Sequence, residues 1–152
     1  MGVNYFFLSK NKNAVQDFFG ESYQLTDTPE FGYRVHIAKA SAGWLPLFQA
    51  HEKCRSIDDI HSAYNSGEFR IIDDSGEEYS WSEFDKEVLH HNGGIDGAIP
   101  KRVHRIDRSN SFVDPDMPDH TPVSHFEYGK GKYTDQFFKD PKGYEFSKGD
   151  FR

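Results

Sequence analysis

The chain has little cysteine and no long apolar run. Cys54 is the one cysteine among its 152 residues, so no disulfide forms within the chain, and the multi-cysteine class of zinc sites is excluded. No apolar stretch approaches the roughly 18 residues that span a bilayer, and the first residues lack the basic and apolar regions of a secretory signal. These absences predict an unanchored, soluble protein in a reducing cytoplasm.

The common signatures of nucleotide binding and hydrolysis are also missing. The sequence holds no P-loop, no GxGxxG, no GxSxG and no catalytic cysteine motif, and it predicts no cofactor. The 25 acidic and 18 basic residues give a net charge of −7, which argues against a general affinity for nucleic acid or anionic lipid. The net charge is compatible with a local basic patch.

Aromatic residues are what the chain has in quantity. Only 36% of the residues are apolar, but they include 14 Phe and 8 Tyr, so aromatic rings must supply much of the burial. A chain of this length is expected to form one core. We therefore predict a single domain over residues 1–152 with an aromatic core.

Two apolar segments joined by "ASAG" predict a β-hairpin over residues 31–51. Alternation places Tyr33, Val35 and Ile37 on one face, and it places Arg34, His36 and Ala38 on the other. Pro46 cannot donate a ladder hydrogen bond, so we expect the second strand at a sheet edge or at a bulge.

Helical and strand patterns surround this hairpin. Short helices are predicted over 13–20, 56–67 and 80–91, the last with Ser80 and Glu83 at the spacing of a capping box. Short strands are predicted at 4–8 and 69–73, and "DPKG" at 140–143 predicts a turn between two aromatic segments. We expect an α+β fold: an antiparallel sheet of four to six strands with two or three short helices on one face.

The segment from about 92 to 124 contains three glycines and four prolines and has little apolar periodicity, which predicts a long irregular loop, with one strand near 101–107. Four basic residues gather there in an acidic chain, and they either meet phosphate or an acidic partner or neutralise the acidic loop that follows: Lys101, Arg102, Arg105 and Arg108. The stretch "DPDMPDHTPVSH" (114–125) holds oxygen and nitrogen donors of the types that bind metals, although an acidic loop of this kind is also typical of a simply solvated segment: Asp114, Asp116, Asp119, His120 and His125.

The pair His90–His91 in "HHNGG" resembles the paired histidines of HNH-type nucleases, which activate water and hold a metal. Histidines at the end of a helix also have a simpler explanation, since their charged form suits the negative end of the helix dipole. No metal site is predicted, and a metal-dependent nuclease or phosphoesterase is kept as the alternative function.

The stretch "HIAKASAGW" is the candidate contact site. Lys39 and Ser41 stand among small residues, where exposed amides and one cation suit an anion, and Trp44 suits stacking or anchoring a partner. The structural alternative is that Trp44 fills the core and Lys39 protects a strand edge. The predicted binding residues are His36, Lys39, Ser41 and Trp44.

Three segments, "HIAKASAGW", "IIDDSGEEYSWSEF" and "DPKGYEFSKGDF", resemble in their order a group of small uncharacterised bacteriophage and prophage proteins. The chain departs from that pattern at Ala38, where a glycine is expected, and at Tyr79, where an aliphatic residue is expected. Some relatives carry cysteine pairs that would suit zinc. This chain lacks them, so no metal is carried over.

The resemblance implies an accessory phage-type protein in the host bacterial cytoplasm. Such a protein would act on host machinery or host defence by binding a protein or a small phosphorylated ligand. Non-enzymatic binding is therefore the expected function, and enzyme activity is kept only as the nuclease or phosphoesterase alternative. A structural or virion-associated role is the third alternative.

Overall fold

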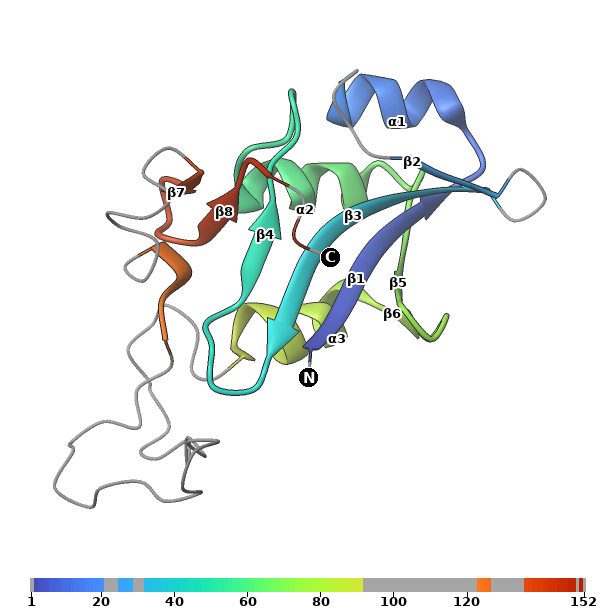
Figure 1. Cartoon of the computed structure of the whole chain (residues 1–152). Coiled ribbons are helices and arrows are strands. Elements are labelled where there is room, and N and C mark those ends of the chain that lie inside the picture. The colour runs from blue at the N-terminus through green and yellow to red at the C-terminus, as the bar shows by residue number, and fades with distance from the viewer. Residues whose placement is uncertain are drawn as a thin grey trace, which may run out of the picture.

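The computed structural model describes residues 2–20, 25–28, 32–91, 123–126, 136–149 and 151, with residues 25–28 described by their backbone alone. These residues form an eight-stranded sheet and three helical segments (Figure 1). The strand predicted near 101–107 and nearly all of the loop predicted at 92–124 lie outside the described residues.

The strand order in the sheet is β6-β5-β1-β3-β4-β8-β7, and β2 pairs with β3 beside this path. Each strand pair is antiparallel except β4 with β8, which is parallel. The strands are β1 Gly2–Ser9, β2 Leu25–Thr28, β3 Gly32–Ser41, β4 Leu47–Gln49, β5 Arg70–Asp73, β6 Glu78–Tyr79, β7 Phe137–Lys139 and β8 Glu145–Ser147. The predicted α+β class is confirmed, with more strands than the four to six expected because several are only two to four residues long.

The three predicted helices form, each with a side-chain cap at its start. Helix α1 (Lys12–Phe19) begins at Asn11, helix α2 (Ile57–Asn65) at Ser56, and helix α3 (Trp81–Phe84) at Ser80. The capping box of Ser80 and Glu83 is present, with both hydrogen bonds made. After one α-helical turn the third helix continues as a π-helix, η1 (Asp85–Leu89). None of the described helices is long and apolar enough to cross a membrane.

The core is aromatic, as the composition predicts. The largest fully buried side chains include Phe7, Phe19, Phe48, Phe84 and Phe146. The ring centroid of Phe7 lies 5.1 Å from that of Phe69 and 5.8 Å from that of Phe19, which are favourable aromatic distances. All three helices contribute to this one cluster, so they share one face of the sheet. Figure 1 shows α2 and α3 on one side of β1 and β3.

A β-bulge corrects one predicted orientation in the hairpin. The pairing of β1 with β3 shifts between Tyr5↔Ala38 and Phe6↔His36, so Ile37 is an extra residue in β3. Ala38 therefore joins Ile37 in the core instead of lying beside His36 as alternation predicts. Lys39, opposite Asn4, takes the place on the His36 face.

The expected position of β4 is also wrong. The hairpin of β3 and β4 is present, but β4 lies between β3 and β8 and is not an edge strand. Pro46 directly precedes Leu47, the first residue of β4, so the ladder requires no N–H group from it.

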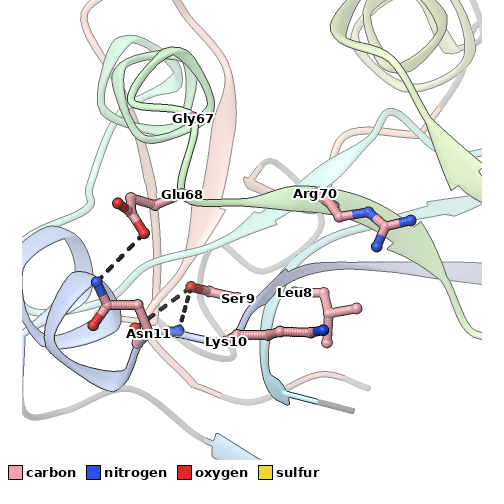
Figure 2. Close-up of a pocket in the computed structure, with 7 residues that line it drawn as sticks. All are labelled: Leu8, Ser9, Lys10, Asn11, Gly67, Glu68 and Arg70. Carbon is pink, nitrogen blue, oxygen red and sulfur yellow. Dashed lines mark hydrogen bonds between the residues drawn. The ribbon is translucent and has the colours of Figure 1, made fainter.

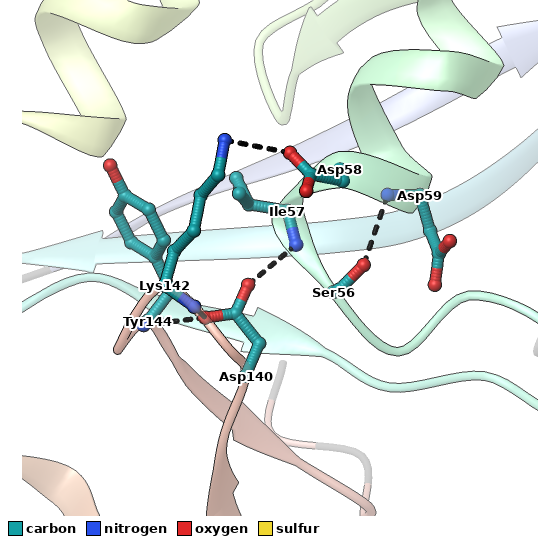
Figure 3. A network of polar contacts seen from close by, with 7 residues as sticks. All are labelled: Ser56, Ile57, Asp58, Asp59, Asp140, Lys142 and Tyr144. Carbon is teal, nitrogen blue, oxygen red and sulfur yellow. Dashed lines mark hydrogen bonds and ion pairs between the residues drawn. The ribbon is translucent and has the colours of Figure 1, made fainter.

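The "DPKG" turn fastens the C-terminal hairpin to α2 (Figure 3). The buried carboxylate of Asp140 accepts hydrogen bonds from the backbone N–H groups of Ile57 (2.8 Å), Tyr144 (2.8 Å) and Lys142 (3.1 Å). The Lys142 ammonium lies 2.8 Å from a carboxylate oxygen of Asp58 in the first turn of α2. One aspartate thus closes its own turn and accepts a hydrogen bond from a backbone N–H at the start of a helix more than 80 residues earlier.

Candidate binding surface at the β3–β4 turn

Beyond the core, the sheet has a second face, turned away from the helices, which we call the polar face. It carries Asn4, Phe6, His36, Gln49 and Ser147 on four different strands. The predicted site residues His36 and Lys39 both lie on it, and Ser41 follows at the end of β3. The structure thus brings these three predicted residues to one side of the sheet.

His36 is a buried member of this face, with 1% of its surface exposed. Its Nε2 atom lies 3.0 Å from Asn4 Oδ1, and its Nδ1 atom lies 3.3 Å from Gln49 Oε1. The rings of Phe6 and Phe151 pack against it at 5.4 and 4.8 Å. In this arrangement His36 supports the surface from below and does not itself reach a partner.

Gln49 fixes the direction of the His36 contact. Its Nε2 group donates to the backbone carbonyls of Ala50 (3.3 Å), Ser147 (3.3 Å) and Gly149 (3.2 Å). The amide oxygen then faces His36 Nδ1, and it accepts a hydrogen bond from that nitrogen in the tautomer that is protonated there. This side chain joins β4 to the C-terminal segment, and nothing in its local sequence marks it.

Trp44 lies in the turn between β3 and β4, where it is partly exposed and outside the main core cluster. Its indole stacks on the imidazole of His125, with centroids 4.5 Å apart and planes inclined by 22°. Backbone bonds hold the two segments together: Val123 N–H donates to Gly43 O (2.8 Å), and Leu45 N–H donates to Val123 O (2.9 Å). The indole is therefore held in place at the surface.

His125 is uncharged at neutral pH. Burial and, to a smaller extent, the positive charge of Lys39 together lower its pKa to about 4, against the raising effect of its hydrogen bond to the Leu45 backbone. Trp44 thus stacks on a neutral ring, and among the described residues Lys39 is a cation close to that ring. The sequence places His125 among metal donors, and the structure places it beside the indole.

The segment that carries His125 is anchored to β8 through Glu145, which is only 3% exposed. Its carboxylate accepts from the backbone N–H of His125 (2.7 Å) and of Phe126 (3.3 Å), and from the hydroxyl of Ser124. A buried carboxylate with several donors is well satisfied. Glu145 therefore fixes the segment whose His125 ring stacks on Trp44, a role that the sequence around Glu145 does not reveal.

Lys39 and Ser41 lie beside the N-terminal end of β1. A Cβ atom at Gly2 would lie 2.6 Å from both Lys39 Cε and Ser41 Oγ, so these side chains fill the space that the glycine leaves. His91 reaches the same strand end, with Nε2 2.8 Å from the carbonyl oxygen of Ser41. Lys39, Ser41, Trp44 and His125 form what we call the Trp44 surface.

Both paired histidines are engaged in contacts within the fold: His91 with Ser41, as described above, and His90 with its own helix. His90 Nδ1 lies 3.0 Å from the Asp85 backbone oxygen and 3.2 Å from its carboxylate, at the end of η1, as a helix-terminal histidine would. Within the part of the chain that the structure describes, no three His, Cys, Asp or Glu side chains are grouped to hold a metal ion. Asp114, Asp116, Asp119 and His120 lie outside that part.

Comparison with known proteins gives no match to this chain, whether with family models, with curated proteins or with solved structures.

Proposed function

We propose that this chain is a non-enzymatic binding protein of the phage accessory type, and that it engages a host protein through the Trp44 surface. The observation that carries the proposal is the Trp44–His125 stack. An indole outside the core is held rigidly by two segments that are far apart in sequence, next to one cation.

A preorganised tryptophan suits a protein contact for a physical reason. Trp contributes a large apolar area, and little conformational entropy is lost on binding when its ring is already fixed. Residues of this type account for most of the binding energy in many interfaces. Lys39 adds charge complementarity to an acidic partner, which favours rapid and specific association.

Photo-crosslinking tests the proposal directly. Ala42 is exposed in the same turn as Trp44, and Ser62 is exposed on α2. A photoreactive phenylalanine analogue would be placed at either position, and the protein irradiated in host-type bacterial lysate. We expect a discrete adduct from position 42 that is absent from position 62 and is lost when Trp44→Ala is added.

Two outcomes would overturn this function. One is an adduct that forms equally from both positions or survives Trp44→Ala. The other is cleavage of plasmid DNA or RNA by the purified protein with Mg²⁺, Mn²⁺ or Zn²⁺ that is lost in His91→Ala, which would establish the nuclease alternative instead.

A further inference from the structure

We propose a second binding site on the polar face, for a small phosphate monoester with an apolar body, between Arg34 and Arg70. The site is formed by Lys10, Arg34 and Arg70 around Leu8 and Phe6, and we call it the arginine site. It is separate from the Trp44 surface and does not depend on the function proposed there.

Strand register brings the two arginines to one row. Leu8 of β1 lies opposite Arg34 of β3 and opposite Arg70 of β5. Paired residues of antiparallel strands point to the same face, so an apolar side chain separates two guanidinium-bearing residues about 10 Å apart. The three positions are distant in sequence, and only the sheet brings them together.

The side chain of Arg34 has a buried hydrogen-bond donor, Nε, that lacks an acceptor among the described residues. Its Cζ atom lies 4.5 Å above the ring of Phe6. A buried donor left without an acceptor is destabilising, and such groups in native proteins usually meet a water or a ligand. A phosphate oxygen beside Phe6 would supply the missing acceptor.

A cavity of about 270 Å³ adjoins this row (Figure 2). Its lining residues are Leu8, Ser9, Lys10, Asn11, Gly67, Glu68 and Arg70. In Figure 2 the side chains of Lys10, Leu8 and Arg70 extend to the same side, away from Glu68. The Glu68 carboxylate accepts from Asn11 Nδ2 at 3.4 Å at the other end. The cavity thus has a cationic end with an apolar floor, and its volume suits a small ligand.

Glu78 competes for the site at present. Its carboxylate forms an ion pair with Arg70, and the two side chains are 49% and 63% exposed. Exposed pairs of this kind contribute little to stability, so a phosphate dianion that contacts two arginines can displace the carboxylate. The site therefore predicts that removing the Glu78 charge strengthens binding.

Amide chemical shifts measured on titration with phenyl phosphate test the proposal, with inorganic phosphate, benzoate and sodium chloride at matched ionic strength for comparison. We expect saturable shifts for Leu8 to Asn11 and for Arg70, with phenyl phosphate bound more tightly than the other three. Arg34→Gln and Arg70→Gln should each weaken binding about tenfold. Glu78→Gln should tighten binding, and Lys142→Gln and Trp44→Ala should leave it unchanged.

Two results would contradict a phosphate-binding site between the arginines. Shifts that do not saturate, or that Lys142→Gln reduces as much as Arg70→Gln does, would show unspecific attraction to surface cations. Tighter binding of benzoate than of phenyl phosphate would contradict the phosphate class. If Arg34→Gln does not fold, Arg70→Gln and Glu78→Gln decide, since both residues are exposed.

Discussion

The two faces of the sheet are stabilised by different kinds of interaction, apolar packing on one and hydrogen bonding on the other. The helix-covered face is packed with phenylalanines and aliphatic side chains whose contacts are non-directional. The polar face buries His36, Gln49 and Ser147, and each is held by directional hydrogen bonds, some between residues about 100 positions apart. The first face gives the chain its cohesion. The second face holds the β3–β4 turn and the C-terminal segment in one geometry, and it carries both proposed sites.

The largest expected effect falls on the helix-covered face. Phe7 is fully buried against Phe19 and Phe69, so Phe7→Ala should lower the free energy of unfolding by about 3–5 kcal/mol. Phe151 is partly exposed on the polar face, so Phe151→Ala should lower the free energy of unfolding by only about 1 kcal/mol. Urea denaturation measures both, and equal losses would remove the distinction between the faces.

On the polar face, Gln49→Ala should have the next largest effect. It leaves His36 Nδ1 without its acceptor and removes one donor from each of three backbone carbonyls, of which Ser147 O keeps the Ala50 N–H and Gly149 O keeps the Ser147 hydroxyl, at a cost of about 1–3 kcal/mol. Phe151→Ala and Gln49→Ala should be non-additive, because both residues contact His36. Strict additivity in a double-mutant cycle would contradict a shared network.

Acid should weaken the fold through histidines. Burial lowers the pKa of His51, and burial together with Lys39 lowers that of His125 to about 4. Below the ordinary value of 6.5 the unfolded chain binds protons that the folded chain does not, so stability should fall by about 2 kcal/mol between pH 7 and 4.5.

Burial raises the pKa of Asp73, but hydrogen bonds from Ser75 and Tyr79 outweigh it, so the pKa of this carboxyl is lowered. The stability that Asp73 contributes is therefore lost only as the pH falls through its lowered pKa, below the range in which the histidines act. His125→Gln should flatten the pH 7 to 4.5 profile, measured by urea denaturation at each pH. A profile as steep as that of the parent protein would show that His125 is charged in the folded state.

The smallest effect is expected at the exposed ion pair of Lys142 and Asp58. Both side chains are more than half exposed, so Lys142→Gln should leave stability almost unchanged. Asp140→Ala, beside it, should cost more, because three backbone donors lose their acceptor. Thermal unfolding of the two variants compares a surface charge with a buried acceptor, and the reverse order would contradict this assignment.

Local signals in the sequence predict the elements well. The Ser80–Glu83 box, the Gly20 helix end and the "DPKG" turn each have a local physical cause, and each is found where expected. The bulge at Ile37 and the interior position of β4 are not predictable in this way. They depend on pairing with Phe6 and with β8, which local periodicity does not contain.

The site shows the same division. Sequence singles out Lys39, Ser41 and Trp44, and the structure puts all three at one end of β3. It does not indicate that His125 stacks on Trp44, that Glu145 anchors that segment, or that Arg34 and Arg70 flank Leu8. Each of these contacts joins segments far apart in the chain.

Trp44→Ala, examined for stability and for partner capture in the same preparation, tests the central claim most directly. Because the indole lies outside the core cluster, we expect the melting temperature to fall by only about 2–4 °C. Affinity for the captured partner should fall about 30-fold or more. A large loss of melting temperature, or capture that persists at full strength, would show that Trp44 serves the fold and not a partner.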